Sequence, residues 1–332
     1  MKAFILDRYK TRTLRLDDVP EPAPDPGDVL VRVEAAGLNL LDAKIRDGEL
    51  KSVLSYKTPL VLGHDLAGTV VKVGANVRRF KPGDAVYARP RDGQIGTFAE
   101  QIVVKEADLA AKPVKLSMVE AASIPLVGLT AWQVLVERAQ IKPGQKVLIH
   151  AGSGGVGTFA IQLARHLGAT VATTASAANA ALVKELGANI VIDYRSQRFE
   201  EELSGYDVVL NSLDAGTLEK SLKVLKPGGH LISISGPPDP AFARARGLNP
   251  VLRLMLRLMS ARIRREAKRA GADYSFLFMR ADGGQLDQIT KLIEDGTIRP
   301  VVDRIFPFAD LNEAFAYIET GRAKGKVVVT LK

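Results

Sequence analysis

The chain contains no cysteine, and its 332 residues include only four histidines and one tryptophan. Without cysteine there can be no disulfide, no thiolate ligand for a metal ion and no cysteine nucleophile. The sequence also lacks a run of about 18 uncharged apolar residues, the length that spans a bilayer. Its first residues, MKAFILDRYK, have no apolar core of the kind found in secretory signals. These absences favour a cytoplasmic globular protein.

Positive charge is concentrated in one segment of the chain. The net charge is +9, and residues 239–270 carry nine basic against two acidic side chains, a balance of +7. The rest of the chain is therefore close to neutral. A basic balance confined to one segment is weak evidence for nucleic acid binding, so no specific nucleic acid partner is expected.

The length of the chain suits about two domains, and an apolar content of 46% supports sizeable cores. Residues 1–122 alternate apolar and polar side chains between turns, which is typical of β structure. Residues 298–332 return to this pattern, with one helix over Leu311–Thr320 and a last strand over Lys326–Leu331. We expect this tail to complete the first domain.

Residues 123–297 alternate strand-like and helix-like segments, which predicts an α/β domain with a doubly wound parallel sheet. The six expected strands are 146–150, 170–174, 190–192, 207–211, 230–235 and 275–279.

The run LIHAGSGGVGTFAIQLARHLGATVAT, residues 148–173, is the most specific motif. A strand leads directly into Gly152, Gly154 and Gly157, and a helix and a second strand follow. This order is that of a dinucleotide-binding unit, in which glycines allow a tight turn, close approach of a pyrophosphate and close helix packing. The helix N-terminus offers free N–H groups to the phosphates.

Several further motifs share one resemblance. They are GLNLLDAKIRDG (37–48), LGHDLAGTVVKVGANVRRFKPGDAVYA (62–88), GTFAEQIVV (96–104), AASIPLVGLTAWQVL (121–135), GANIVIDYR (187–195), LKPGGHLISISG (225–236) and GRAKGKVVV (321–329). With the glycine motif, they resemble the medium-chain dehydrogenase/reductase superfamily, in its zinc-independent quinone oxidoreductase and alkenal/enone reductase branch. The resemblance implies a GroES-like catalytic domain over 1–122, completed by 298–332, and a Rossmann domain over 123–297. It also implies NADPH-dependent hydride transfer to a quinone or an α,β-unsaturated carbonyl.

The resemblance includes the segments that form the zinc site of alcohol dehydrogenases, but most of the zinc ligands are replaced in this chain. Gly63-His64 matches a Gly-His-Glu segment whose histidine binds zinc, while Asp65 stands in place of the glutamate and Asn39 in place of a ligand cysteine. Zinc needs a near-tetrahedral set of thiolate, imidazole or carboxylate ligands. We therefore expect no metal, and hydride acceptors that need no Lewis acid.

NADP(H) is predicted as the cofactor because no acidic residue ends the second strand, where NAD enzymes hold the ribose hydroxyls. Residues 170–176 read TVATTAS, and by resemblance Ser176 and Tyr194 lie near the extra phosphate, with Arg195 adjacent. Related enzymes often carry a lysine where Asn179 stands, so this chain lacks one positive charge that would bind the extra phosphate.

The resemblance also assigns the nicotinamide and substrate end. Asn39, Asp42 and Lys44 are placed beside the nicotinamide ribose and ring, and Thr130 under its amide. Lys44, Asn39 and Tyr56 are the catalytic candidates, since an ammonium near the acceptor oxygen would stabilise developing negative charge. The full set of expected cofactor contacts is Asn39, Asp42, Lys44, Thr130, Gly152, Ser153, Gly154, Gly155, Val156, Gly157, Thr174, Ser176, Tyr194, Arg195, Asn211, Ser235 and Phe278.

The arginine-rich segment 248–269 allows three interpretations: a lid over the substrate, a dimer contact, or attachment to an anionic membrane. Its place between the fifth and sixth strands favours the first two. The sixth strand, within Tyr274–Met279, has no charge or proline to protect an edge, so a two-fold homodimer joined along it is expected.

Two other functions stay open at this point. Enoyl-thioester reduction would use the arginine-rich segment to bind a phosphate group of the acyl carrier. A non-catalytic cofactor-binding or RNA-binding protein is the alternative from another class.

Overall fold

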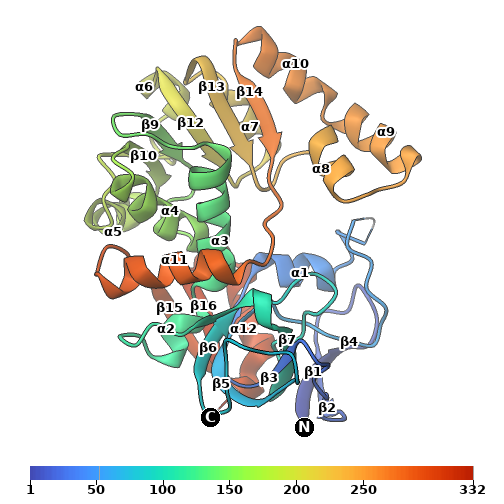
Figure 1. Cartoon of the computed structure of the whole chain (residues 1–332). Helices are drawn as coiled ribbons and strands as arrows, with labels where there is room; N and C mark the ends of the chain where they lie inside the picture. The colour runs from blue at the N-terminus through green and yellow to red at the C-terminus, as the bar shows by residue number, and fades with distance from the viewer. Residues whose placement is uncertain (52, 332) are drawn as a thin grey trace. The chain divides into compact units, whose positions relative to one another are not determined.

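The computed structural model describes residues 1–51 and 53–331, and the chain divides into two compact units (Figure 1). Unit 1 consists of Met1–Leu129 and Arg280–Lys332, and unit 2 of Thr130–Met279. The sequence places these limits at 122 and 298, so the observed unit 2 is shorter at both ends than the segment expected.

The second limit differs because helix α11 (Gly283–Glu294) packs within unit 1. The Tyr87 hydroxyl donates to the Leu286 carbonyl at 2.9 Å. A Cβ atom on Gly283 would lie 2.3 Å from the Leu109 carbonyl oxygen, so only glycine lets the helix start this close to the strand. A helix in the α/β part of the sequence thus belongs to the β-rich unit.

Unit 1 is built on a seven-stranded sheet and a three-stranded sheet, as alternating apolar residues predict. The large sheet runs β15-β16-β3-β5-β6-β8, with β7 paired to β3, and the small one β2-β1-β4. The strands are β1 (Lys2–Leu6), β2 (Arg15–Asp18), β3 (Asp28–Leu38), β4 (Leu60–Val61), β5 (Asp65–Val73), β6 (Ala85–Ala88), β7 (Gln101–Lys105), β8 (Leu109–Ala111), β15 (Val302–Pro307) and β16 (Lys326–Thr330).

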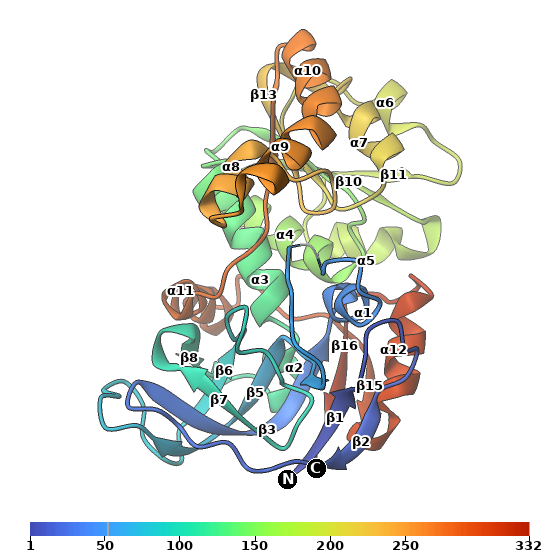
Figure 2. The ribbon, with the colours of Figure 1, turned by 90° about the vertical axis from the view of Figure 1, so that its right-hand side faces the viewer.

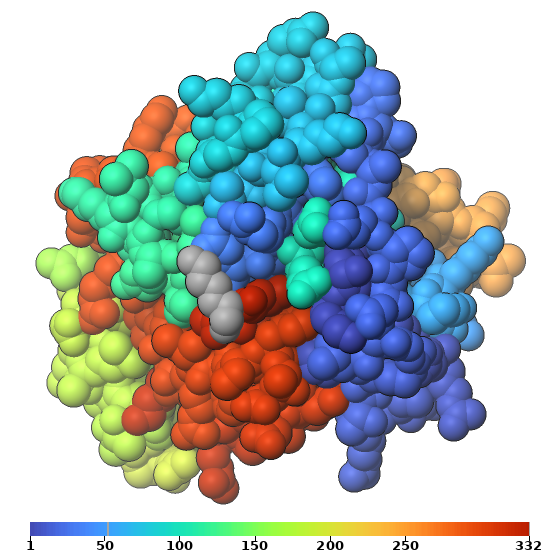
Figure 3. Space-filling view, turned by 90° about the horizontal axis from the view of Figure 1, so that it is seen from below, coloured from blue at the N-terminus to red at the C-terminus, as the bar shows by residue number. Residues whose placement is uncertain are grey.

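The end of the chain completes unit 1, as predicted. Strand β16 pairs antiparallel with β3, with Val328 opposite Gly37. Residues from the two ends of the sequence, blue and red in Figure 3, therefore lie side by side on one face. The helices of this unit are α1 (Leu40–Arg46), α2 (Met118–Ala122), α11 and α12 (Leu311–Glu319), and α3 (Pro125–Trp132) leads into unit 2.

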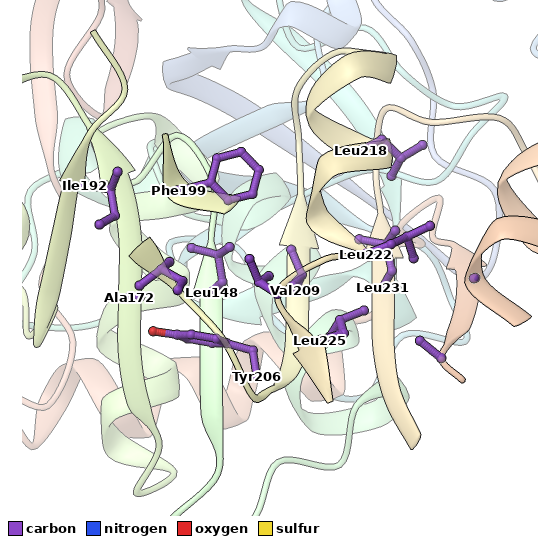
Figure 4. Close-up of a cluster of buried hydrophobic side chains, with 14 of the residues drawn as sticks. Leu148, Ala172, Ile192, Phe199, Tyr206, Val209, Leu218, Leu222, Leu225 and Leu231 are labelled. Carbon is purple, nitrogen blue, oxygen red and sulfur yellow. The ribbon is translucent and has the colours of Figure 1, made fainter. Parts of the chain in front are cut away.

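Unit 2 contains the predicted six-stranded parallel sheet, in the order β11-β10-β9-β12-β13-β14. The strands are β9 (Lys146–Ile149), β10 (Thr170–Ala175), β11 (Ile190–Asp193), β12 (Tyr206–Asn211), β13 (Leu225–Ser233) and β14 (Asp273–Phe276). Four helices follow β9 to β12: α4 (Gly155–His166), α5 (Ala180–Glu185), α6 (Phe199–Glu202) and α7 (Ala215–Ser221). A buried apolar cluster joins sheet and helices, with Leu148, Val209 and Leu231 from three strands and Leu218 from α7 (Figure 4).

Three more helices, α8 (Pro240–Ala245), α9 (Pro250–Met259) and α10 (Ala261–Arg269), separate β13 from β14 (Figure 2). The side chains of Asp239 and Asn249 cap the N-termini of α8 and α9, and each of these two helices begins with a proline. Within the described residues, no helix combines the length and apolar content needed to cross a bilayer.

The edge strand β14 is shorter than the predicted 275–279 and is partly covered. The Phe276 N–H donates to the Asp239 carboxylate at 3.0 Å, and the Phe276 ring packs edge-on against Phe242 of α8 at 5.1 Å between centroids. One side chain thus satisfies a backbone donor that an exposed edge would leave free.

Candidate functional site

Most of the predicted cofactor residues of unit 2 follow the carboxyl ends of the strands of its sheet. The glycine motif follows β9, Ser176 follows β10, Tyr194 and Arg195 follow β11, and Phe278 lies beyond β14. Because the strands are parallel, all these positions lie at the carboxyl ends. The strand order reverses between β9 and β12, the point at which such sheets bind nucleotides.

The loop between β9 and α4 is held in shape by backbone hydrogen bonds. Ala151 adopts φ 52°, a left-handed conformation that costs a non-glycine residue about 1 kcal/mol. Its carbonyl accepts from the Gly154 N–H at 2.9 Å, and the Gly152 N–H donates to the Thr174 carbonyl at 2.9 Å. A strained residue at a tightly bonded turn is typical of a ligand site.

The three glycines of the motif have different reasons to lack a side chain. A Cβ on Gly152 would lie 2.0 Å from Thr173 Oγ1, and one on Gly157 would lie 2.3 Å from the Ala151 carbonyl oxygen. Both are therefore required by the packing of the chain itself. A Cβ on Gly154 would meet only the Ala151 carbonyl oxygen, at 3.3 Å.

Gly154 thus leaves space that the protein does not fill, beside a helix N-terminus. Gly154 is the N-cap residue of α4, and no side chain of the described residues caps this helix. The first N–H groups of the helix, from Gly155, Val156 and Gly157, have no partner within the helix. Such a terminus suits an anionic group, so the loop fits the pyrophosphate of a dinucleotide.

Thr174 supports this loop from the inside. Its side chain is buried, and its hydroxyl accepts from the Ala151 N–H at 3.1 Å and lies 3.2 Å from His150 Nδ1. His150 Nε2 lies 2.9 Å from the Ser221 hydroxyl. Burial lowers the pKa of His150 to about 4, so the imidazole is neutral at neutral pH. Thr174 therefore acts on the shape of the loop.

The residues expected near the extra phosphate of NADP(H) remain accessible to different extents. Ser176 is buried, whereas Tyr194 and Arg195 are exposed, with the guanidinium 5.8 Å from the Tyr194 ring centroid. Asn179 donates to the Ser153 hydroxyl at 3.0 Å and so connects the segment after β10 to the glycine loop. Its Oδ1 is buried, with no hydrogen-bond partner in the described part of the chain.

The other predicted positions of unit 2 divide between buried and open ones. Asn211 is fully buried and donates to the Ser233 hydroxyl at 3.2 Å, while the exposed Ser235 donates to the Leu213 carbonyl at 2.6 Å. Phe278 is half-buried, and the Arg246 guanidinium carbon lies over its ring, 4.7 Å from the ring centroid. Thr130 is buried and is the first residue of unit 2.

Unit 1 carries a separate buried polar cluster of five residues. The Lys326 ammonium donates to Asp65 Oδ2 at 2.9 Å and to Asn39 Oδ1 at 2.5 Å, and Asn39 Nδ2 donates to Asp65 Oδ2 at 2.9 Å. The Asn39 N–H donates to Asp42 Oδ2 at 3.0 Å, and Asp42 Oδ1 lies 2.6 Å from His64 Nδ1. All five side chains are at most 7% exposed.

This cluster does not fit zinc. His64 offers a buried Nε2 that has no protein partner among the described residues, but the Asp65 carboxylate is already bonded to an ammonium. A metal ion there would meet the positive charge of Lys326. No group of three or more histidine, aspartate or glutamate side chains in the described ranges could hold a metal ion.

Of the catalytic candidates, Lys44 is exposed on α1 and Tyr56 is half-buried. The backbone N–H and carbonyl of Tyr56 are both bonded to the Tyr9 hydroxyl, at 3.0 and 2.8 Å. Lys44, Asn39 and Asp42 share α1 and its N-cap in unit 1, whereas the glycine loop belongs to unit 2, so each group is placed within its own unit.

Two buried residues were not among the predicted site residues. Lys326 lies within the motif GRAKGKVVV. Asp239 accepts hydrogen bonds from the Phe276 N–H of β14 and the Phe242 N–H of α8. An ionised side chain within an apolar strand pattern is the signal for Lys326, because lysine is almost never fully buried unless it is paired.

Two protein families match the chain. The family described as "Alcohol dehydrogenase GroES-like domain" matches residues 25–114, and the one described as "Zinc-binding dehydrogenase" matches residues 186–329. The first match lies in unit 1, and the second covers most of unit 2 and the end of the chain.

Individual proteins are similar over almost the whole chain. NAD(P)H oxidoreductase RTN4IP1, mitochondrial, of Danio rerio is 34% identical, over 100% of this chain and 91% of its own. NADPH-dependent alkenal/one oxidoreductase, chloroplastic, of Arabidopsis thaliana is 37% identical, over 99% of this chain and 79% of its own. The structure of the quinone oxidoreductase from Coxiella burnetii has a TM-score of 0.85 at 31% identity, over 100% of this chain and 99% of that chain.

Proposed function

The chain belongs to the medium-chain dehydrogenase/reductase superfamily, in its quinone and enone reductase branch, and we propose that it is an NADPH-dependent reductase of quinones or α,β-unsaturated carbonyls. The similarity to an alkenal/one oxidoreductase and to a quinone oxidoreductase supports the acceptor class. The observation that carries the cofactor half of the proposal is the space left open at Gly154 beside the uncapped N-terminus of α4.

NADPH, when bound, supplies a hydride to the acceptor, which is the β-carbon of an enone or the quinone. The residues of the chain then have to bind the acceptor and stabilise the negative charge that develops on its oxygen. We assign that second task to Lys44, whose exposed ammonium stands on α1, with Asn39 and Tyr56 as the other candidates. Steady-state kinetics and an NADPH titration of Lys44→Met should show a larger loss in kcat than in the affinity for NADPH.

No zinc takes part in this proposal, because the Lys326 ammonium occupies the carboxylate that a metal ion would need. Reduction of an activated carbonyl requires no metal Lewis acid when a hydrogen-bond donor or an ammonium faces the oxygen. Activity of chelator-treated protein that is unchanged supports this part of the proposal, and activity that follows zinc content refutes it.

A panel of acceptors tests the acceptor class. NADPH oxidation is followed with a quinone, an enone and an enoyl-thioester at matched concentrations. Faster turnover of the quinone or the enone supports the proposal, whereas preference for the thioester favours enoyl-thioester reduction. RNA binding that weakens with salt, without any turnover, would favour the non-catalytic alternative.

We infer the preference for NADPH over NADH from the residues at the carboxyl ends of β10 and β11. Arg195 is exposed there, and residues 170–176 include no carboxylate. Arg195→Gln should weaken NADPH binding about ten-fold, the value of one charged hydrogen bond, and leave NADH unaffected. Lys184→Gln, another exposed cation of unit 2, is the control. Equal use of both cofactors by the unmodified protein would refute the preference.

Assembly and compartment are further parts of the proposal. The remaining edge of β14 supports a two-fold homodimer, although Asp239 already satisfies the Phe276 N–H. Light scattering at micromolar concentration should give the mass of two chains, and the mass of one chain would refute the dimer. The cytoplasm stays the predicted compartment, while two relatives are named mitochondrial and chloroplastic.

A further inference from the structure

Helix α9 exposes an apolar surface that no part of the described chain covers. Five of its large apolar side chains are more than two-fifths exposed. These are Val251 at 77%, Leu254 at 57%, Met255 at 42%, Leu258 at 65% and Met259 at 54%. They account for five of the thirteen most exposed large hydrophobic side chains described in the chain, so the exposure is concentrated in this one helix.

The exposed side chains form one continuous stripe along α9. Their spacing, 251, 254, 255, 258 and 259, is that of one helix face. At about 100° per residue the stripe spans roughly 140° of the helix. Leu256 and Ser260, which are buried, lie on the opposite side. The helix is therefore anchored by a narrow inner face and presents its apolar stripe outward. We call this stripe the α9 stripe.

Basic side chains border the α9 stripe and continue along the next helix. Arg257 lies on one flank of α9, about 60° from Leu254, and Arg253 lies one turn earlier towards the inner side of the helix; both are exposed. On α10, a second set of basic side chains is exposed: Arg265, Lys268 and Arg269. None of these five cations forms an ion pair within the described chain. Arg262, by contrast, pairs with Glu219 and Glu266 at 3.0 Å.

The connection between the two helices is fixed. The Ser260 hydroxyl donates to the Leu256 carbonyl at 2.9 Å, and Arg264 donates from Nη2 to the Arg257 carbonyl at 3.1 Å. Ile263 and Ala267 bury the inner face of α10. The apolar stripe and the free cations are thus held on one rigid helix pair.

We propose that the α9–α10 pair docks on an anionic phospholipid surface, with the α9 stripe inserted between the headgroups and the basic side chains on the lipid phosphates. An apolar stripe flanked by arginine is the pattern of a helix that lies in a membrane interface. Ten residues give a helix about 15 Å long, which is too short to span a bilayer. The helix therefore lies flat.

Charge complementarity decides between a lipid surface and a second copy of the chain. The segment 239–270 carries a balance of +7. A two-fold contact through the α9 stripe would bring two such segments together, and like charges in contact oppose binding. An anionic surface attracts the same charges and accepts the apolar stripe.

Vesicle co-sedimentation of the intact protein tests the proposal. The probes are vesicles of phosphatidylcholine alone and vesicles that contain about one-third phosphatidylserine, at 0.1 M salt. The protein should bind the acidic vesicles, and 0.5 M salt should weaken the binding because added ions screen surface charge.

Two pairs of substitutions separate the contributions. Arg253→Gln with Arg257→Gln should lower binding to acidic vesicles about five-fold, since Arg257 borders the stripe and one cation near such a surface contributes about a factor of five. Leu254→Ser with Leu258→Ser should lower it at least ten-fold. Both pairs lie at exposed positions. The matched controls are Lys72→Gln with Lys81→Gln and Val114→Ser, which are exposed positions of unit 1 and should bind as the unmodified protein does.

Three results would overturn the proposal. One is absence of binding to acidic vesicles at 0.1 M salt. The second is binding that depends on the arginines but not on the leucines, which indicates simple electrostatic adsorption. The third is a dimer of the intact protein that the leucine pair converts to monomers, which assigns the α9 stripe to a second copy.

Discussion

Lys326 shows how a single residue determines the chemistry of the cluster in unit 1. A buried ammonium loses its hydration, and this cost is offset only when a carboxylate and further hydrogen bonds surround it. Lys326 has such surroundings, because Asp65, Asn39 and the Leu38 carbonyl all accept from its ammonium. The residue thereby supplies internally the positive charge that a metal ion would supply.

Removal of this charge should destabilise the protein strongly. Lys326→Met leaves the Asp65 carboxylate buried without its cation, so the free energy of unfolding should fall by about 3–5 kcal/mol. Urea unfolding measures the change. Lys324→Met, at an exposed neighbour, should have almost no effect. Lys326→Met with Asp65→Asn should recover part of the loss, and a single variant as stable as the unmodified protein would contradict the account.

His150 makes the stability of unit 2 depend on pH. Burial lowers its pKa from 6.5 to about 4, so the unfolded chain binds a proton more readily than the folded one. Stability that is present above pH 6.5 should therefore be lost as the pH falls towards 4, by about 2–3 kcal/mol. Urea unfolding at pH 7 and pH 4.5 measures this loss.

The matched variants are His150→Gln and His166→Gln, at a buried and an exposed histidine. The first should show a smaller loss of stability between the two pH values, and the second the same loss as the unmodified protein. An equal loss in all three proteins would remove His150 as the cause.

Among the structural elements, the glycine loop needs three glycines within residues 152–157, each for a different reason. Gly152 and Gly157 allow the loop to pack against β10 and α4, while Gly154 leaves room beside the helix terminus. The sequence spacing predicted all three positions. Only the structure separates the glycines that packing requires from the one that it does not.

Substitutions at two of these glycines should therefore have different effects. Gly154→Val should fold with a loss of under about 1 kcal/mol and weaken NADPH binding by about 2 kcal/mol, roughly thirty-fold in Kd. Gly157→Ala should lower the free energy of unfolding itself, because its Cβ meets backbone at 2.3 Å. Fluorescence titration and urea unfolding measure the two effects. A folded Gly154→Val protein with unchanged affinity would place the cofactor elsewhere.

The periodic elements could be predicted from the sequence, and the exceptions have physical causes. The strand predicted at 146–150 is observed as Lys146–Ile149, and the final strand as Lys326–Thr330. Strand β14 is observed over Asp273–Phe276, so it both starts and ends earlier than predicted, and its outer side is held by the bond from the Phe276 N–H to Asp239. That contact joins residues 37 positions apart, and no local pattern encodes it.

The site residues stay a prediction. Ser176 and Arg195 were expected from the resemblance, and in the structure they follow the carboxyl ends of β10 and β11. The direction of a side chain does not follow from the sequence: Thr174 points inward to the Ala151 N–H. The pairing of Lys326 with Asp65 joins residues 261 positions apart, so its geometry required the sheet in which β3 pairs with both β16 and β5.

At the scale of the whole molecule, one chain divides two tasks between two units. Unit 2 holds a loop suited to a dinucleotide, and unit 1 holds Lys44, the proposed partner of the acceptor oxygen, and a buried cluster in which Lys326 already neutralises Asp65. The family relationship connects these parts in one reaction. We therefore expect hydride transfer to a quinone or an enone without a metal.

Isotope tracing follows the transferred hydride itself. NADPH carrying deuterium at both C4 positions of the nicotinamide is mixed with chelator-treated protein and either an enone or a quinone. The account predicts oxidation of NADPH by at least one acceptor. Deuterium should appear on the β-carbon of the reduced enone, or leave NADPH and exchange into water from the quinol oxygen. Absence of oxidation with both acceptors, or oxidation only after zinc is added, would contradict it.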